Sequence, residues 1–368
     1  MIRSLAILVL LVGGTAASAH ELEDQTASAT QFGGLFRARD LTPFGFLRLD
    51  MRPSHAVSAP VGSWGIETEI AYQNTWALSP QVERYLTSLP GRRELGPKEL
   101  TAIRELPGEN YLLDLELTEL ELRLHYKFAE DWAGYAIVGG VIYGGGSMDA
   151  AIERFHQALG FSTFGRPALS RDDANLILDL KTAQSAAFET PTSGGFLDPT
   201  LGVRYTGARL PHRWRLVIES AVKLPVAGHR RWLSTGTADF GLQAGLQRFS
   251  PRHALFLNAS AVYYDGAGGL VSVQSQIIPT LVLGYERRMT PRTNLILQAY
   301  ASDSVYSRRE TDLPELLANK YQLTFGVRHR RGRSLFSFAL TENVQNFNNT
   351  PDIGMHAGWA YVPPVTRN

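Results

Sequence analysis

The stretch YQLTFGVR, residues 321–328, alternates large apolar side chains with polar or small ones. A period of two places alternate side chains on opposite faces of a strand, so this segment has one apolar and one polar face. WRLVI at 214–218 has the same pattern, and similar runs recur after residue 60. The chain is therefore expected to consist mainly of long, two-faced β-strands.

Residues 1–19 have the three parts of a secretory signal. Arg3 supplies the positive charge, residues 5–12 form an apolar core and Ala17-Ser18-Ala19 is a small-residue cleavage site. The core is too short to span a bilayer comfortably, and no uninterrupted apolar stretch of about 18 residues follows it. The chain has no cysteine, which excludes disulfides and lipid attachment at a cysteine. An exported protein without transmembrane helices is expected.

Short and long connections alternate along the chain, as in outer-membrane barrels with short periplasmic turns and longer outer loops. Short turns are expected near 129–131, 208–212, 250–252, 290–292 and 330–333, and longer ones near 78–109, 146–196, 226–235, 265–272, 305–317 and 344–352. The intervening segments predict about twelve strands. They lie near 62–77, 110–128, 131–145, 197–208, 212–225, 236–249, 253–265, 272–288, 292–304, 317–329, 334–344 and 353–363.

These features predict an all-β fold, an antiparallel transmembrane β-barrel with one short helix in a long loop. An alternative with fourteen strands arises if residues 31–58 form a strand and another lies within 174–180. A soluble β-sandwich shares the alternation, but its strands are usually about five or six residues long. Aromatic residues near the expected strand ends, such as Trp214 and Trp359, also favour a barrel in a membrane.

The expected organisation has four parts. Residues 1–19 are the signal peptide, 20–61 an N-terminal periplasmic or plug segment, 62–363 the barrel and 364–368 a C-terminal tail. An even strand number places both termini in the periplasm of a Gram-negative cell. The expected partners are outer-membrane lipid and lipopolysaccharide, the barrel-assembly machinery and a small polar solute, and the protein is expected to be a monomer. With a net charge of +1 the chain has no strongly basic character, so no nucleic-acid partner is expected.

Several expected strands carry charged residues on the face that should point into the lumen. Residues 110–128 change apolar phase near Thr118-Glu119, and a β-bulge is expected there. Facing acidic and basic walls would select among solutes, or they would pair into a structural network. The expected lumen charges are Glu67, Glu69, Asp114, Glu116, Glu119, Glu121, Arg123, Arg204, Arg215, Lys320 and Arg328.

Residues 147–160 predict one clear helix, because apolar residues recur at helical spacing. The helix lies in the longest connection, so it is expected to fold inward as a plug or to cap the outer mouth. The residues assigned to this plug or loop helix are Met148, Ile152, Phe155, His156 and Leu159. A histidine there is more often a packing residue than a functional one.

Four groups of short motifs recur in order along the chain. They are FRARDLTPF at 36–44, YLLDLE at 111–116, GGGSMD at 144–149 with IERFH at 152–156, and LTEN at 340–343 with TPDI at 350–353. In this order the chain resembles the bacterial family of domain of unknown function 3187, which consists of predicted outer-membrane barrels. The resemblance implies the fold and the location and brings no established activity. One departure is the terminal PPVTRN at 363–368, since such barrels usually end on an aromatic residue.

No catalytic or cofactor-binding motif accompanies the strand pattern. The sequence contains neither a Gly-x-Ser-x-Gly elbow nor a His-Glu-x-x-His zinc pattern, so no catalytic, cofactor-binding or metal residue is assigned. The expected function is a narrow passive channel or binding barrel for small polar solutes. The alternatives are a non-conducting structural barrel and a lipid-modifying outer-membrane enzyme.

Overall fold

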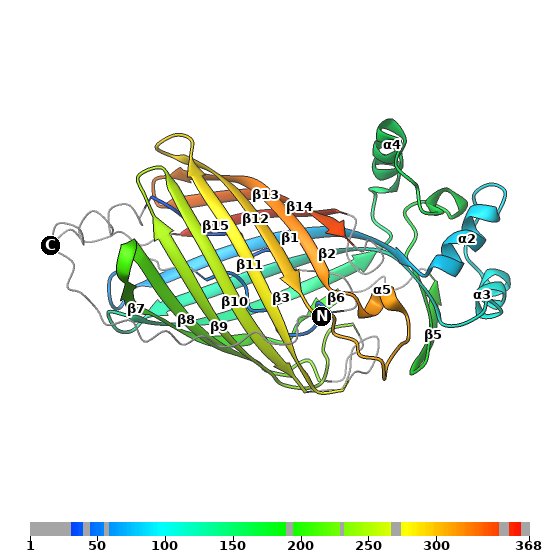
Figure 1. Ribbon diagram of the computed structural model, residues 1–368, viewed down its shortest axis with the longest axis horizontal. Helices are drawn as coiled ribbons and strands as arrows, with labels where there is room; N and C mark the ends of the chain where they lie inside the picture. The colour runs from blue at the N-terminus through cyan, green and yellow to red at the C-terminus, as the bar shows by residue number, and fades with distance from the viewer. Residues whose placement is uncertain are drawn as a thin grey trace.

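The computed structural model describes residues 31–39, 45–54, 59–188, 194–228, 232–265, 274–345 and 353–361. Twelve antiparallel strands form a closed barrel (Figure 1). The barrel strands are β1 (Trp64–Leu78), β2 (Asn110–Lys127), β3 (Trp132–Gly144), β7 (Thr200–Leu210), β8 (Trp214–Lys223), β9 (Asp239–Phe249), β10 (His253–Tyr264), β11 (Gln276–Arg288), β12 (Thr293–Ser302), β13 (Lys320–Arg331), β14 (Ser334–Gln345) and β15 (Ile353–Tyr361).

The barrel closes between its first and last strands. β1 pairs with β15 from Ile66, opposite Tyr361, to Asn74, opposite Ile353. The prediction of twelve strands is confirmed, and the fourteen-stranded alternative is wrong. Residues 175–180 do form a strand, β4 (Asn175–Leu180), but it pairs with the first residues of β2, where β3 no longer does. The described part of residues 31–58 contains no strand.

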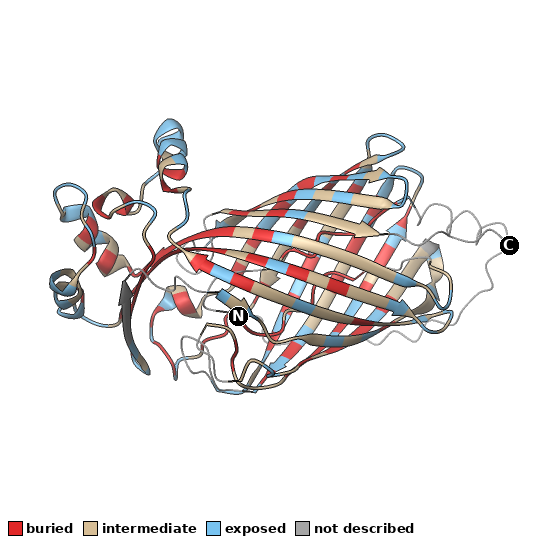
Figure 2. Cartoon of the chain, turned by 180° about the vertical axis from the view of Figure 1, so that it is seen from behind, coloured by how far each residue is buried: buried red, intermediate tan, exposed pale blue. Residues whose placement is uncertain are grey.

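The period-two pattern separates the two faces of the wall as expected. On β10, Leu255 and Tyr263 are exposed, whereas Phe256 and Asn258 are buried. Figure 2 shows this alternation of buried and exposed residues along the strands. Exposed apolar side chains therefore form the outside of the barrel, where they can face lipid. Among the described residues, no helix is long and apolar enough to cross a membrane.

β1 and β2 continue past the other strands and carry a small subdomain at one end of the barrel (Figure 1). We call this the rim subdomain: the ends of β1 and β2 with the elements that pack on them. Its apolar core includes Trp76, Val82, Leu86, Leu112 and Ile177. The packed elements are α2 (Pro80–Ser88), α3 (Pro97–Arg104), α4 (Asp149–Leu159), η1 (Arg166–Ala168), β4 and β5 (Ala183–Phe188).

The β-bulge expected near Thr118-Glu119 is wrong. β2 keeps an unbroken register with β1 and with β3 through these residues. Leu113, Leu115 and Leu117 are therefore on the same inner face as Glu119, and all three are fully buried. The apolar phase changes because the inner face is covered at this level by other parts of the chain, including Phe46 and Leu316. Apolar residues on β2 thus mark burial on either side of the wall and not lipid contact alone.

The N-terminal segment lies inside the barrel. Residues 31–39, the first plug segment, and residues 45–54, the second plug segment, contain many of the most deeply buried side chains, among them Phe32, Phe36 and Phe46. Both segments hydrogen-bond to inner-face residues of the barrel strands, for example Glu286 and Asp239. The expected signal peptide and the tail 364–368 lie outside the described residues.

Candidate functional site in the barrel lumen

The inner faces of β1 and β2 form an acidic wall. Glu67 and Glu69 on β1 lie opposite Arg123 and Glu121 on β2, and Glu119 follows on the same face. Period-two alternation in paired strands puts these side chains side by side. Arg123 lies 3.6 Å from Glu67, 3.7 Å from Glu69 and 2.7 Å from Glu121. One wall arginine thus serves three carboxylates, which leaves an excess of negative charge on this wall.

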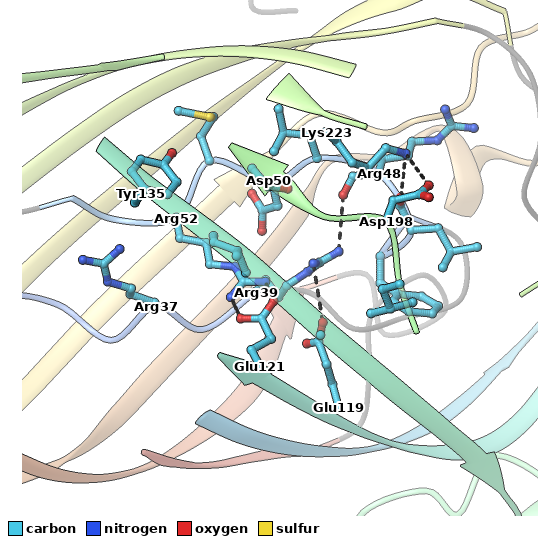
Figure 3. Close-up of a pocket in the computed structure, with 18 of the residues that line it drawn as sticks. Arg37, Arg39, Arg48, Asp50, Arg52, Glu119, Glu121, Tyr135, Asp198 and Lys223 are labelled. Carbon is cyan, nitrogen blue, oxygen red and sulfur yellow. Dashed lines mark hydrogen bonds and ion pairs between the residues drawn. The ribbon is translucent and has the colours of Figure 1, made fainter. Parts of the chain in front are cut away.

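Arginines of the plug segments supply the missing positive charge. Arg37 Nε lies 3.2 Å from Glu67, and Arg39 Nη1 lies 3.7 Å from Glu119. Figure 3 shows Arg39 pointing toward Glu119. The remaining pair is the most extensive: both terminal nitrogens of Arg52 donate to the two carboxylate oxygens of Glu121. A planar guanidinium suits this two-point contact with a carboxylate.

Two histidines complete the acidic wall. His125 Nε2 lies 3.3 Å from Glu67, and His356 Nδ1 on β15 lies 3.5 Å from Glu69. His356 is buried, whereas His125 is less deeply covered. All four wall carboxylates therefore have a cationic or ionisable partner within ion-pair distance. The sequence analysis placed Glu67, Glu69, Glu119, Glu121 and Arg123 on this face, and the structure brings them together.

A β-bulge occurs in the wall between β3 and β7, where none was expected. β6 (Gly194–Phe196) and β7 both pair with β3, and between their pairs three residues, 197–199, lie opposite two, 138–139. A bulge changes the direction of the side chains that follow it. Here it turns the buried Asp198 carboxylate inward, 3.8 Å from Lys223 Nζ.

Lys223 binds the second plug segment to this side of the barrel. Its ammonium donates to the backbone oxygen of Leu47 at 2.9 Å and to the Thr235 hydroxyl at 2.6 Å, and it lies 3.0 Å from Asp239. Asp239 in turn accepts the backbone N–H of Leu49 at 2.9 Å. Both members of this buried ion pair, Lys223 and Asp239, therefore hydrogen-bond to the backbone of the second plug segment.

Further polar groups of β9 and β10 hold the same segment. Gln243 donates to the backbone oxygen of Arg52 at 3.0 Å, and Gln247 donates to that of Ser54 at 2.8 Å. The Tyr264 hydroxyl donates to the backbone oxygen of Leu49 at 3.1 Å. These bonds satisfy a plug backbone that has no partner strand of its own.

A cavity of about 40 Å³ lies beside the second plug segment. Charged residues of the plug and of the wall line it, including Arg39, Arg48, Glu119 and Glu219 (Figure 3). A polar space of this size accommodates a few water molecules. This cavity does not accommodate a solute of the size of a sugar.

The first plug segment rests on a different surface. Phe32, Leu35 and Phe36 pack against apolar inner residues of β9 to β14, such as Phe256 and Ile296. The apolar side chains of this segment are almost completely buried. Dispersion and the exclusion of water hold such a contact without any ionised group.

Two charged residues clamp the backbone of the first plug segment. Glu286 accepts the N–H of Gly33 at 3.1 Å and that of Gly34 at 3.0 Å. Arg328 donates to the backbone oxygens of Gly34 and Leu35, at 2.5 Å and 3.3 Å. The sequence analysis assigned Arg328 to the lumen but not Glu286.

The other expected basic residues of the lumen occupy separate positions. Arg204 pairs with Glu219 at 2.6 Å, and the Tyr135 hydroxyl donates to the same carboxylate at 2.8 Å. Arg215 lies over the ring of Phe249, and Lys320 is buried at the start of β13. None of these three cations faces the acidic wall as one basic surface, so the structure does not form the two opposed walls that the sequence suggested.

Asp114 and Glu116 do not face the lumen. Because β2 contains no bulge, their even positions place them on the outward face, where the rim subdomain covers them. Glu116 accepts the N–H groups of Ser147 and Met148 at 3.0 Å, and Asp114 accepts the amide of Asn175 at 3.3 Å. Their assignment to the lumen is therefore wrong: Glu116 holds the chain that leads into α4, and Asp114 holds the start of β4.

The expected plug helix is not inside the barrel. α4 lies in the rim subdomain, to the side of the barrel wall (Figure 1). Ile152 is buried against the subdomain, Phe155 and Leu159 are exposed, and the His156 ring contacts Phe161 and Phe164. The N-terminal segment, the other region suggested as a plug, occupies the lumen instead.

Glu153 attaches α4 to the rim subdomain. Its carboxylate accepts from Arg92 at 2.8 Å and from Arg171 at 2.5 Å. Burial alone would raise the pKa of Glu153, but the hydrogen bonds from Arg171 and Arg92 outweigh it and lower this pKa below its ordinary value. Glu153 is thus held as an anion by two arginines, which fixes the helix to the subdomain.

Sequence reasoning missed the plug arginines at 37, 39, 48 and 52. The available pattern was weak: basic residues are spaced two apart at 37 and 39 and four apart at 48 and 52. No regular secondary structure accompanies them, so periodicity gave no face to assign. Asp198 was missed because an unexpected bulge determines its direction. Among the described residues, no group of His, Asp and Glu is arranged to hold a metal ion.

Comparisons with solved structures show what the fold is similar to. The outer membrane channel COG4313 from Pseudomonas putida F1 aligns with a TM-score of 0.51 and 11% identity, over 85% of this chain and 99% of that one. The toluene transporter TbuX of Ralstonia pickettii aligns with a TM-score of 0.40 and 11% identity, over 92% and 97%. The NanC porin aligns with a TM-score of 0.40 and 6% identity, over 81% and 99%.

The first of these likenesses supports the fold of an outer-membrane barrel and, at this identity, nothing finer. No curated protein matched the chain. A protein-family model, described as "Protein of unknown function (DUF3187)", matches residues 99–362, which include all of the barrel from β2 to β15. The chain therefore belongs to the DUF3187 family.

Proposed function

We propose that this protein is a passive outer-membrane channel for small polar solutes and that the second plug segment closes it. The barrel has the fold of an outer membrane channel, with lipid-compatible side chains outside. Behind the plug, the inner wall is polar: it presents Gln243, Asn258, Gln298 and Thr324, together with the acidic wall. Such a surface suits hydrated solutes and does not suit hydrocarbons.

One observation carries the proposal: the second plug segment is attached by separate polar contacts beside a cavity. Arg52, Lys223 and Gln243 each make a discrete bond to or from it. A covering that is loosely packed on one side can be displaced at a lower free-energy cost than one that fills its space. Displacement of residues 45–54 would connect the two ends of the lumen.

The same proposal includes the orientation of the barrel in the outer membrane. The short turns, such as residues 250–252 and 290–292, lie at the end opposite to the rim subdomain, and both described chain ends of the barrel approach that end. We place this end in the periplasm and the rim subdomain outside the cell. Outer-membrane lipid, lipopolysaccharide and the barrel-assembly machinery are then the partners, and the barrel is closed as a monomer.

The second candidate is a barrel that does not conduct. It is favoured by the extent of ion pairing, because Glu67, Glu69, Glu119 and Glu121 all have partners that the plug or the wall supplies. A structural network of this kind stabilises a closed lumen. The two candidates differ in whether weakening the plug produces a current.

Planar-bilayer recordings of the full chain in potassium chloride test this. We expect low conductance from the unmodified protein and a several-fold rise from Arg52→Met, which removes the two-point contact with Glu121. Arg84→Met, at an exposed position of α2, is the matched control and should leave the current unchanged. Folding is checked by the shift in electrophoretic mobility on heating. Folded Arg52→Met protein without current would overturn the channel proposal and favour the non-conducting barrel.

A further inference from the structure

Helix α4 lies beyond the end of the barrel from which β1 and β2 project, displaced to one side (Figure 1). Its attachment explains this position. The N–H groups that precede α4 donate to Glu116 on the outward face of β2, and Trp76 Nε1 on the outward face of β1 donates to the backbone oxygen of Phe164 at 3.0 Å. Because both anchors are on the face that meets lipid further along the strands, α4 extends over the lipid and not over the pore.

The helix has three distinct faces. Asp149, Ile152 and Glu153 are buried and point toward the rim subdomain. At about 100° per residue, two other faces remain exposed, one polar and one apolar. The polar face presents Arg154 and Gln157, and the apolar face presents Ala151, Phe155, Ala158 and Leu159. An ordinary solvated surface helix would have one exposed polar face only.

The exposed apolar face is large for an element in water. Phe155 and Leu159 each expose 54% of their surface, and Phe161, which follows the helix, exposes 57%. The rings of Phe155 and Phe161 lie 6.4 Å apart, edge to face, so these side chains form one cluster. A contiguous exposed cluster of this kind indicates a contact surface.

The chain reaches this cluster from a strand with a lipid-facing outer surface. On β3, Val138 and Ile142 are outward and exposed by 46% and 65%, and Ile142 is two residues from the end of the strand. α4 begins five residues after that end, at Asp149. The chain thus passes from the apolar outside of the wall to α4 within a few residues.

We propose that α4 is an interfacial helix that inserts its apolar face into the outer leaflet of the membrane. Phe155, Leu159 and Phe161 contact the lipid acyl chains near the headgroups, and Arg154 and Gln157 face the water. Amphipathic helices that lie in a membrane plane bury their apolar face by about 5–10 Å. The cationic Arg154 at the edge of this face suits the negatively charged groups of outer-leaflet lipid. The inference rests on the proposed orientation, with the rim subdomain outside the cell, and not on conduction.

Site-directed spin labelling tests this in the intact chain, which contains no native cysteine. Single variants Phe155→Cys and Leu159→Cys report the apolar face, and Arg154→Cys and Gln157→Cys are matched controls on the same helix. Each labelled protein is reconstituted in vesicles of phosphatidylethanolamine, phosphatidylglycerol and lipopolysaccharide. Collision rates with oxygen, which concentrates in lipid, and with a water-soluble nickel chelate are then compared.

We expect the ratio of oxygen to nickel accessibility to be several-fold higher at 155 and 159 than at 154 and 157. Equal, nickel-dominated accessibility at all four positions would overturn the proposal and show a solvated helix. Low accessibility to both reagents at 155 and 159 would also overturn it, because protein would then cover the face. Spin–spin broadening that disappears on dilution with unlabelled protein would identify that cover as a second copy. A conducting or non-conducting barrel is compatible with either result.

Discussion

The two plug segments occupy the same lumen but are held by different forces. The first, residues 31–39, packs Phe32, Leu35 and Phe36 into an apolar surface and is clamped by Glu286 and Arg328, and only Arg37 and Arg39 at its end pair with the acidic wall. The second, residues 45–54, is held by ion pairs and single hydrogen bonds beside a cavity of about 40 Å³. We therefore call the first segment the anchor and the second the latch, and we expect the latch to be displaced more easily.

The difference follows from what each segment faces. The inner wall of β9 to β14 offers apolar residues next to most of the first segment. The walls of β1, β2 and β8 offer charges to the end of the first segment and to the second. A buried charge is stable only while its partner is in place, so the latch depends on each of its members. An apolar contact loses stability in proportion to the surface removed and is insensitive to salt.

The largest effect is expected from Lys223→Met. The substitution leaves Asp198 and Asp239 buried without their cation, and it removes the bond to the backbone oxygen of Leu47. Removing one member of a buried ion pair lowers the stability of a protein by about 3–5 kcal/mol. The free energy of unfolding in urea should fall by that amount, and protease should cut the second plug segment. Lys98→Met, at an exposed position of α3, should change neither.

Leu35→Ala tests the anchor and should cost about 3 kcal/mol, because Leu35 is 97% buried in a filled apolar contact. The unfolding free energy is measured at low and at high salt. If the first segment is an apolar anchor, the loss is the same at both salt concentrations. A loss that depended strongly on salt would contradict the division into anchor and latch.

A smaller effect is expected from Arg39→Met. Arg39 approaches Glu119 to 3.7 Å without a hydrogen bond between them, whereas Arg52 makes two hydrogen bonds to Glu121. We expect Arg39→Met to cost about 1 kcal/mol, the value of an ordinary net polar interaction. The test is the same unfolding measurement on Arg39→Met and Arg52→Met in parallel. Equal losses of unfolding free energy in the two variants would contradict this expectation, because the contribution of each pair to stability would then not depend on its geometry.

The smallest effect concerns the attachment of α4. The lowered pKa of Glu153 means that its contacts with Arg92 and Arg171 contribute stability above the ordinary carboxyl pKa. This contribution is lost as the pH falls through the lowered pKa of the folded state. A spin label at position 154 should therefore become more mobile in acid below about pH 4. The same label in a Glu153→Gln background should show no such pH dependence.

The strands could be predicted from the sequence because period-two alternation is a local property. Glu119, Glu121 and Arg123 were assigned to the same face for that reason, and they lie side by side on one face of β2. Asp114 and Glu116 were misplaced because Leu113 and Leu115 were taken as lipid-facing, whereas tertiary contacts inside the barrel bury them. Polarity alone does not tell which side of a wall is covered.

The plug could not be predicted in detail for a different reason. Residues 31–39 and 45–54 form no helix or strand, so their positions depend on side-chain contacts with strands far away in the sequence. The N-terminal location of the plug was one of two expectations, and the helix at 149–159 was the other. The hydrogen bonds of Trp76 and Glu116 on the outward faces of β1 and β2 keep this helix out of the lumen. Both bonds depend on the register of β1 and β2.

Reversible disulfides in this cysteine-free chain separate the latch from the anchor. A Cβ atom at Gly241 would lie 2.7 Å from Cγ of Met51, and one at Gly284 would lie 2.9 Å from Cγ of Leu35. Met51→Cys with Gly241→Cys therefore suits a bond across the latch, and Leu35→Cys with Gly284→Cys suits one across the anchor.

The most direct test of the account is the current through single barrels before and after a reductant is added. We predict that Met51→Cys/Gly241→Cys in the Arg52→Met background is closed when oxidised and conducts after reduction. Leu35→Cys/Gly284→Cys in the same background should conduct in both states. A steady current through barrels whose Met51–Gly241 bond is intact would contradict the central claim that residues 45–54 close the lumen.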